Sequence, residues 1–374
     1  MRIALISHTH FYWTGLYARY FLAQGHDVRV ISFSQEPLEG VPVDYIGSGT
    51  PSRRKALHYF AGVPALRSRL RAFAPDVAFA TYLSSNGLLT ALCHSGPLVV
   101  SAHGSDVLAG PGARWASARM IRFTCRRADV VHAVSQHLVD ALGRLRVPAD
   151  PIHCFPIGVD ADWYVPPAEG RRADLPPRVV CTRHQESVYA NETIVEALAL
   201  LRADALDVRA TLLGGGALLE ERRAQIRELG LEDVVDLPGH QPPELVRRAL
   251  QTASVYVSAS TSDGASSSLL EAMACGLFPV VSAIPANLAW IEDGATGLLF
   301  EPGDTRGLAE ALRRAALDAD LRASAALRNR ALVLREGNLT RNLSRMEALL
   351  ERATEMHRGP ARRNRSVSER RVSS

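Results

Sequence analysis

Short apolar runs alternate with helical patterns along most of the chain. In the first half the apolar runs are RIALIS, DVRVIS, VAFATY, PLVVSAH and DVVHAVS. Their length is typical of buried strands, and the segments between them, such as 15–25, which Gly25 closes, and 113–127, have the spacing of amphipathic helices. This alternation predicts a parallel sheet with helices on both faces.

A second series of the same kind follows a polar, proline-containing stretch at 165–177. Its strand-like runs are RVVCTR, RATLLGGG, VVDLPG, SVYVSAS, FPVVS and GLLFEP. Helical patterns lie between these runs, at 191–203, 217–229, 243–252 and 305–317. The chain therefore predicts two open α/β domains. Because such domains bind ligands at the carboxyl ends of their strands, we expect a site in a cleft between the two.

The composition agrees with two globular domains of ordinary size. The chain has 374 residues, 47% of them apolar, and a mean hydropathy of −0.02. Its five cysteines are scattered without a CxxC pair, which favours reduced thiols over a zinc or disulfide framework. MRIALISH is interpreted as a first strand and not as a signal peptide, and no apolar run is long enough to span a membrane. A cytoplasmic protein is expected.

Basic residues are concentrated in the first half of the chain. Segment 49–128 contains eleven Lys or Arg and two acids, Asp76 and Asp106. This imbalance indicates either an anionic partner or an arginine-favouring proteome, since Lys55 is the only lysine. The stretch 52–73 is predicted to be an amphipathic helix, either an ordinary surface helix or one that lies on an anionic membrane. The arginine-rich end of the chain favours a solvated terminus over a nucleic-acid partner.

The segment TSDGASSSLLEAMACG, residues 261–276, carries the most distinctive chemistry. Serine, glycine and aspartate favour turns and caps, whereas LLEAMA consists of good helix formers. We therefore expect a loop followed by a helix that begins near Ser267, with Asp263 before the helix and Glu271 within its first two turns. The N–H groups of residues 266–268 would then lack intrahelical partners and would form an anion site between the two carboxylates.

Several ordered motifs resemble one family. TSDGASSSLLEAMACGLFPVVS is similar to the E-x7-E signature of the retaining GT-B glycosyltransferases of family 4, with Asp263 in place of the usual first glutamate. GLLFEPGDTRGLAEAL, ATLLGGGALLEERRAQIRELGLEDVVDLPGHQPPEL, PLVVSAHGSD, VHAVSQHL and FPIGVD match further segments of that family. The resemblance covers essentially residues 1–357.

The resemblance implies a GT-B fold, in which two Rossmann-like domains with parallel sheets face an interdomain cleft. It places an acceptor-side domain at 1–162 and a nucleotide-sugar-binding domain at 163–340. A helix at 341–357 would pack back towards the N-terminal domain, and 358–374 would be a disordered basic tail.

The same resemblance assigns the candidate catalytic residues. Asp263 would lie beside the sugar of the donor, although a simple turn or cap role is the alternative. His103, in AHGSD after a predicted strand, would lie against the transferred sugar, unless it only satisfies a strand-end backbone group. Arg183, after RVVCT, would clamp the leaving diphosphate with its forked guanidinium. The family's lysine is absent after Arg183, and a turn that contains a tyrosine, SVYAN, stands in its place.

A second group would hold the donor. Glu271 would accept hydrogen bonds from the ribose hydroxyls, whereas without the motif it would be read as an exposed helix glutamate. The loop amides and several glycines would contact the phosphates, the sugar and the base. These donor-binding candidates are Gly264, Ala265, Ser266, Ser267, Ser268, Gly15, Gly214, Gly239 and His240. His8 and His10 are spaced as metal ligands could be, but no further ligands are found in the sequence, so no metal site is expected.

The function implied by the resemblance is transfer of a sugar from a nucleotide sugar, with UDP favoured over GDP, to a hydroxyl of a glycan, lipid or small metabolite. The reaction would retain the anomeric configuration and need neither metal nor cofactor. Expected partners are the nucleotide sugar, an acceptor that the sequence does not identify and an anionic membrane surface at the inner face, without nucleic acid. A sugar-nucleotide epimerase of the same architecture and a non-catalytic partner subunit are the alternatives.

Overall fold

The computed structural model describes residues 1–47, 61–108, 114–147, 152–169, 177–206 and 208–358. The described chain forms two compact units, which we treat separately. The first unit comprises Met1–Ile157 and Arg341–Ser374, and the second comprises Gly158–Thr340. Part of the predicted helix 52–73 and nearly all of the predicted tail lie outside the described residues.

The first unit contains a seven-stranded parallel sheet in the order β3-β2-β1-β4-β5-β6-β7. Its strands are β1 (Arg2–Ile6), β2 (Asp27–Ser32), β3 (Val43–Tyr45), β4 (Val77–Thr81), β5 (Leu98–Ala102), β6 (Val130–Ala133) and β7 (Ile152–Cys154). Its helices are α1 (Tyr12–Ala23), α3 (Val63–Phe73), α4 (Leu88–Cys93), α5 (Arg114–Arg127), α6 (Gln136–Arg144) and α14 (Leu339–Arg358), with a π-helical turn, η1 (Leu83–Gly87), after β4.

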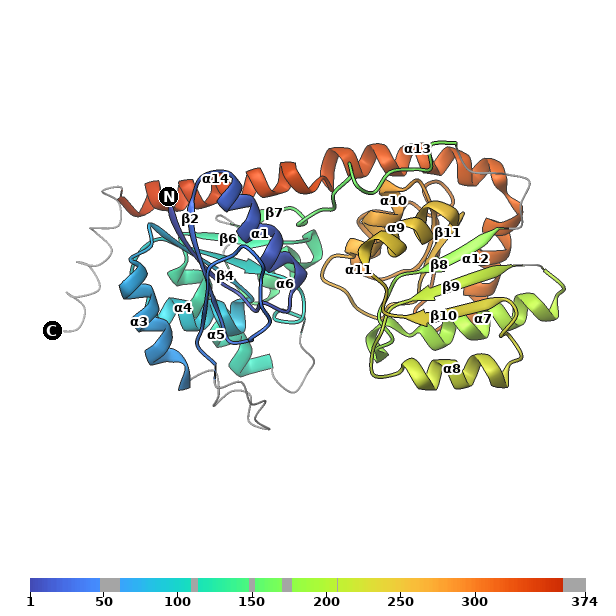
Figure 1. Cartoon of the computed structure of the whole chain (residues 1–374), viewed down its shortest axis with the longest axis horizontal. Coiled ribbons are helices and arrows are strands. Elements are labelled where there is room, and N and C mark those ends of the chain that lie inside the picture. The colour runs from blue at the N-terminus through green and yellow to red at the C-terminus, as the bar shows by residue number, and fades with distance from the viewer. Residues whose placement is uncertain (48–60, 109–113, 148–151, 170–176, 207, 359–374) are drawn as a thin grey trace. The chain divides into compact units, whose positions relative to one another are not determined.

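Burial explains why these strands form. Every residue of β4 and β5 is buried, as expected for central strands of a sheet that is covered on both faces. Helices α3, α4 and α5 pack as neighbours, and Figure 1 shows them together on one side of the sheet. On α14, Glu347 accepts hydrogen bonds from Tyr20 at 3.0 Å and pairs with His26 at 2.7 Å, which fixes α14 beside α1.

The second unit contains a six-stranded parallel sheet in the order β10-β9-β8-β11-β12-β13. Its strands are β8 (Arg178–Cys181), β9 (Arg209–Leu213), β10 (Val235–Gly239), β11 (Val255–Ser258), β12 (Phe278–Ser282) and β13 (Leu298–Phe300). Its helices are α7 (Asn191–Ala203), α8 (Leu219–Glu228), α9 (Pro243–Thr252), α10 (Ser267–Ala274), α11 (Pro285–Leu288), α12 (Thr305–Leu317) and α13 (Ala319–Glu336), with a short 3-10 turn, η3 (Ser187–Tyr189), after β8.

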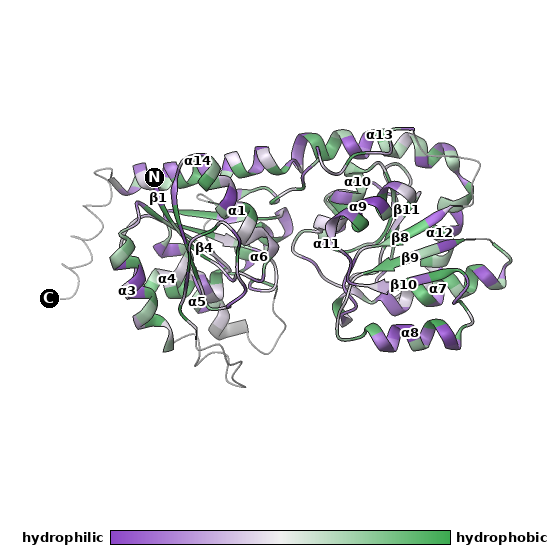
Figure 2. Cartoon of the chain, viewed as in Figure 1, coloured by the Kyte–Doolittle hydropathy of each residue, from purple (hydrophilic) through white to green (hydrophobic). Residues whose placement is uncertain are grey.

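The sheet of the second unit has an apolar core on each face. One core packs α7, α8 and α12 against the sheet, and the other packs α9, α10 and α13. Figure 2 shows mostly apolar strands and helices that carry both apolar and polar residues, which is the pattern that the sequence predicts. The two Rossmann-like α/β units confirm the predicted fold class. Among the residues described, no helix combines the length and the apolar character needed to cross a bilayer.

Candidate functional site

The second unit brings its candidate residues to the switch point of its sheet. From β8 the chain proceeds outward through β9 and β10, and then returns to place β11 on the other side of β8. Crossovers on the two sides of such a point lie on opposite faces of the sheet, so the loops after β8 and β11 leave a crevice between them. Arg183 lies in the first of these loops and Asp263 in the second.

Arg183 is the centre of this arrangement. Its Nη2 donates to Asp263 Oδ2 at 2.5 Å, and its Nη1 donates to Ser268 Oγ at 3.0 Å and to Ser266 Oγ at 3.5 Å. The guanidinium also lies 4.1 Å from the ring centroid of Tyr189. Tyr189 belongs to the turn that replaces the family's lysine, so this turn does supply a side chain to Arg183.

The electrostatics keep Arg183 charged. Burial alone would lower the pKa of this guanidinium, but the negative charge of Asp263 and the nearby Tyr256 and Tyr189 raise its pKa overall. Arg183 Nε and the hydroxyl of the preceding residue, Thr182, are buried and have no hydrogen-bond partner among the described residues. Buried donors of this kind normally have a partner, so the site has capacity for an anion.

Helix α10 begins where the sequence predicts. Ser266 is its N-cap, and its Oγ accepts from Leu269 N at 3.4 Å, while Gly264 and Ala265 belong to the preceding loop. One of the three amides predicted to lack intrahelical partners has a partner outside the helix. Ser267 N donates to Ala265 O at 3.1 Å because the chain makes a tight turn just before the helix. The serine hydroxyls, which sequence reasoning did not single out, contact Arg183 instead.

Glu271 lies on the same helix, one turn after Ser268. Burial raises the pKa of its carboxyl to about 7, against the hydrogen bond from Tyr164 and the positive charge of Arg183, which both lower the pKa. Glu271 is therefore electrostatically coupled to Arg183, although the two residues are far apart in the sequence. A partly buried carboxyl with a pKa near neutrality is typical of a binding or catalytic site.

Two glycines allow the loop after β9 to pack closely against the loop after β8. Gly214 has φ +122°, and a Cβ there would lie 2.5 Å from Arg183 O. Gly216 has φ +151°, and a Cβ would lie 2.4 Å from Gln185 O. A larger residue at either position would push the Arg183 loop away. Gly214 N donates to Gly239 O at 2.9 Å, and His240 follows as an exposed residue.

The first unit has its own switch point, between β1 and β4. Four rings from the loops after β1, β4 and β5 stack there: Phe11, Trp13, Tyr82 and His103. Phe11 and Trp13 have ring centroids 4.4 Å apart, and His103 lies 5.1 Å from Trp13 and 5.3 Å from Tyr82. Tyr82 has φ 65° and ψ 106°, an unfavourable backbone for a non-glycine residue, which costs about 1–3 kcal/mol and is typical of functional sites.

His103 is held neutral in this stack. Burial lowers the pKa of its imidazole to about 3. Its Nε2 is buried without a hydrogen-bond partner among the described residues, as are Trp13 Nε1 and the side-chain amide of Asn86. His103 therefore does not satisfy a backbone group through Nε2. Asp106 has the structural role expected for it, since its carboxylate accepts from the N–H groups of Leu83, His103 and Gly104.

Gly15 and the nearby histidines follow β1. Gly15 lies in the first turn of α1 and not in a loop, and a Cβ there would lie 2.9 Å from the guanidinium of Arg19. The rings of His8 and His10 lie 5.2 Å apart, and burial lowers the pKa of His8 to about 4. Within the described ranges, no three His, Cys, Asp or Glu side chains are placed to hold a metal ion.

Sequence profiles assign this architecture to a family. The profile described as "Glycosyl transferases group 1" matches residues 173–331, and the profile described as "Glycosyltransferase Family 4" matches residues 14–163. Together these profiles span most of both units. The chain belongs to the group 1 glycosyl transferases.

Individual relatives of this group 1 chain are distant. A GDP-mannose:cellobiosyl-diphosphopolyprenol alpha-mannosyltransferase of Xanthomonas oryzae pv. oryzae is 28% identical over 240 residues, which are 62% of this chain and 61% of the relative. A GDP-mannose-dependent alpha-(1-6)-phosphatidylinositol monomannoside mannosyltransferase of Mycolicibacterium smegmatis is 27% identical over 233 residues, 58% of this chain and 59% of the relative. The chain thus spans less than two thirds of each relative's length.

Solved structures share the fold over almost the whole chain. Sucrose-phosphate synthase (tll1590) from Thermosynechococcus elongatus matches with a TM-score of 0.79 at 20% identity, covering 93% of this chain and 98% of that one. Anabaena Alr3699/HepE in complex with UDP and glucose matches with a TM-score of 0.77 at 18% identity, covering 94% and 99%. The group 1 chain therefore has the GT-B fold.

Proposed function

We propose that this group 1 chain is a retaining, metal-independent glycosyltransferase that uses a nucleotide-sugar donor. The proposal rests on the hydrogen bonds of Arg183, which connect the loop after β8 to Asp263 and to the start of α10 at one switch point. UDP is the favoured nucleotide because Anabaena Alr3699/HepE binds UDP and UDP-glucose, and GDP is next because two relatives are named for GDP-mannose.

In this proposal the donor diphosphate binds between Arg183 and the N-terminus of α10. The guanidinium forms paired hydrogen bonds to phosphate oxygens, and the unpartnered Arg183 Nε and Thr182 hydroxyl supply two further donors. Because phosphate competes with Asp263 for the guanidinium, the carboxylate becomes available for a hydroxyl of the sugar. Glu271, as a carboxylate, accepts from the ribose diol.

The reaction we propose is a front-face displacement. The bond between the anomeric carbon and the phosphate oxygen breaks, the acceptor oxygen bonds to the same carbon from the same side, and its proton passes to the departing phosphate. The positive charge of Arg183 and the helix terminus stabilise the negative charge that develops on the diphosphate. Positioning both substrates supplies much of the remaining rate enhancement.

The acceptor is proposed to be a hydroxyl of a glycan, a lipid or a small metabolite. Support for an acceptor side in the first unit comes from the ring stack at its switch point, where Trp13 Nε1 and His103 Nε2 lack partners among the described residues. We also propose a cytoplasmic protein that binds peripherally to the inner face of the membrane. The described part of the basic segment, α3, carries Arg67, Arg69 and Arg71 without an acid.

A thermal-shift screen with UDP-, GDP- and ADP-sugars, followed by a transfer assay with the stabilising donor, tests this proposal. One donor should raise the melting temperature, and Arg183→Ala should reduce the shift and lower the transfer rate by about 10²- to 10³-fold. The salt bridge that already occupies Arg183 favours one alternative, a non-catalytic partner subunit. Failure of every nucleotide and nucleotide sugar to bind would support that alternative and reject an enzyme.

A further inference from the structure

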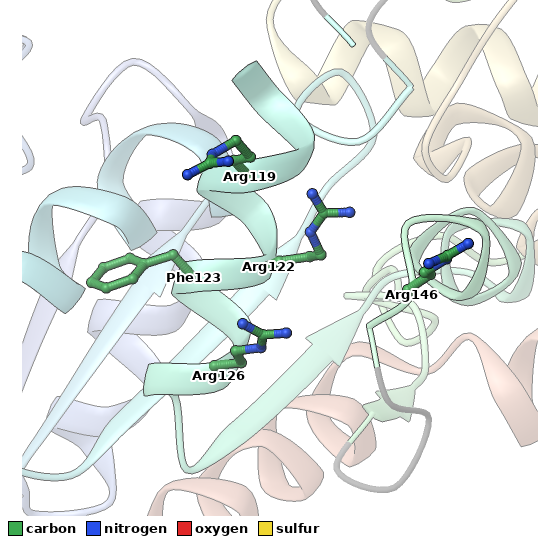
Figure 3. Close-up of a pocket in the computed structure, with 5 residues that line it drawn as sticks. All are labelled: Arg119, Arg122, Phe123, Arg126 and Arg146. Carbon is green, nitrogen blue, oxygen red and sulfur yellow. The ribbon is translucent and has the colours of Figure 1, made fainter. Parts of the chain in front are cut away.

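A second basic site lies in the first unit, on helix α5. Four arginines and one phenylalanine line a pocket of about 590 Å³: Arg119, Arg122, Phe123, Arg126 and Arg146. Its size falls within the range of small-molecule sites. Figure 3 shows Arg122 and Arg126 projecting from α5 on the side of Arg146, which belongs to the turn after α6.

The spacing on α5 places its arginines along one stripe. Residues 119, 122 and 126 follow one another at intervals of three and four, so their side chains are neighbours on the helix surface. Like charges at these intervals destabilise a helix unless counter-charges relieve them. Helices α3, α4 and α5 together contain eight arginines and no acid, so the surrounding helical layer supplies no such counter-charge.

Several arginines elsewhere in the fold are held by an ion pair, whereas three of those in this pocket are not. Arg183, Arg202, Arg222 and Arg313 each contact a carboxylate. By contrast, Arg122, Arg126 and Arg146 form no ion pair with any residue that the structure describes. Three guanidinium groups that share one pocket without an ion pair repel one another, and a bound anion would relieve this repulsion.

The pocket is remote from the switch point of its own sheet. In the β5–α5–β6 crossover the helix runs antiparallel to the strands, so its last turn lies near their amino ends. The structure agrees, because Asp129 Oδ2 accepts from Leu98 N, at the first residue of β5, at 2.9 Å. Arg126 is in that last turn, and Arg146 precedes β7. His103 and the ring stack follow the carboxyl ends of the strands, at the opposite edge.

We propose that this arginine pocket binds a diphosphate group, at a site separate from the nucleotide-sugar site. A guanidinium presents parallel N–H groups that match two phosphate oxygens. The three guanidinium groups without an ion pair already offer more donors than a single phosphate can accept, with Arg119 beside them, and their charge suits two linked phosphoryl groups. Exposed Phe123 adds an apolar wall, which suits either a soluble diphosphate with an organic portion or the headgroup of a diphosphate lipid.

The test is a calorimetric titration of the full chain with inorganic pyrophosphate. All proteins carry Arg183→Gln so that the donor site does not contribute. In this background Arg122→Gln/Arg126→Gln should weaken binding by at least about tenfold, the loss expected from one charge-assisted hydrogen bond. Glutamine keeps helix propensity while it removes the charge. The matched control is Arg328→Gln/Arg335→Gln, which removes two charges from the exposed surface of α13 and should leave the affinity within about twofold.

A flotation assay with phosphatidylcholine vesicles, with and without a minor fraction of polyprenyl diphosphate, separates the two sources. Loss of pyrophosphate binding in the α5 variant supports a soluble ligand, and loss of vesicle binding alone supports the lipid headgroup. If the α5 variant matches the α13 control in both assays, the proposal is rejected.

Should the α5 variant unfold, Arg146→Asn replaces it, because asparagine tolerates the left-handed backbone at φ 57°. Retained nucleotide-sugar binding by the α5 variant without Arg183→Gln separates this result from the proposed function.

Discussion

The two switch points have the same topology but opposite chemistry. In the second unit the loops hold a charged centre, Arg183, whose two terminal nitrogens already have partners. In the first unit they hold stacked rings, and two of the ring nitrogens, Trp13 Nε1 and His103 Nε2, are buried and lack partners among the described residues. A preorganised cation suits a ligand with fixed charge, whereas unsatisfied neutral donors and acceptors suit a hydroxylated ligand.

The two units therefore differ in how the ligand-free site is stabilised. The ion pair of Arg183 with Asp263 compensates the cost of burying a guanidinium, so the second unit can keep its site intact without ligand. In the first unit, the unsatisfied nitrogens are a cost that a bound hydrogen-bonding partner would offset, and the strained backbone of Tyr82 is a further cost of this arrangement. The predictions below follow from this contrast, from the largest expected effect to the smallest.

The largest effect is expected for Arg183→Ala. Loss of the guanidinium removes the group that stabilises the departing diphosphate, so the transfer rate should fall by about 10²- to 10³-fold. The substitution also leaves Asp263 buried without its cation, and the melting temperature should fall. Steady-state kinetics and thermal denaturation measure both effects. Arg202→Ala is the control, because that residue forms a surface pair with Asp233 and should change neither quantity appreciably. An Arg183→Ala enzyme with an unaltered rate would contradict the assignment.

Glu271→Gln should weaken nucleotide binding by about tenfold, because an amide oxygen accepts from a diol less strongly than a carboxylate. It should also stabilise the free protein at neutral pH. Burial raises the pKa of Glu271 from 4.5 in the unfolded chain to about 7 in the folded protein. The protonated carboxyl therefore contributes fully to the free energy of unfolding below about pH 4.5, and this contribution is lost as the pH rises through about 7.

Glutamine does not ionise, so the Glu271→Gln variant does not lose this contribution to stability as the pH rises. The melting temperature of Glu271→Gln relative to the natural protein should therefore increase between about pH 5 and pH 7 and then level off. Scanning fluorimetry across this range measures the difference, and exposed Glu228→Gln serves as the control. A difference that does not vary with pH would show that the carboxyl is not desolvated.

The first unit gives the next smaller effect. His103→Phe keeps an aromatic ring in the stack but removes the buried nitrogen, and we expect kcat/KM for the acceptor to fall by about tenfold, the contribution of one hydrogen bond to a buried polar group. Donor affinity, measured by titration of the nucleotide, should not change. If the substitution weakened donor binding and left acceptor kinetics intact, the contrast between the two units would be lost.

The sequence predicted the fold well because its apolar runs and glycines act locally. The helix that begins at Ser267, its cap and the turn between β9 and α8 all follow from residue types close in the chain. The contacts of Arg183 could not be predicted in this way. Ser268 meets it only because β8 and β11 are adjacent in the sheet, and Tyr189 meets it through the turn η3 in its own loop. Neither residue type alone indicates such a role.

Three further features lay beyond sequence reasoning. The strained backbone of Tyr82 carries no signature in the residue type, since tyrosine seldom adopts a positive φ. The partner of Ser267 N is a loop carbonyl in the tight turn before the helix, and counting the free amides at a helix start does not reveal such a turn. The arginine stripe on α5 was visible as an excess of charge, but its convergence with Arg146 depends on the packing of two separate helices.

The smallest effect is expected for Tyr189, which lies over the guanidinium of Arg183. A cation–π contact contributes about 0.5–1 kcal/mol, so Tyr189→Leu should weaken nucleotide-sugar binding about two- to fivefold, while Tyr189→Phe should retain most of the affinity. The comparison is informative because a lysine is the usual residue in this region of the family. If Tyr189 only orients Arg183, a Tyr189→Lys variant should not exceed the natural affinity, since a second cation would repel the guanidinium. Titration calorimetry with the preferred donor measures all three variants. Equal losses for leucine and phenylalanine would indicate that the hydroxyl, and not the ring, is the functional part of this turn.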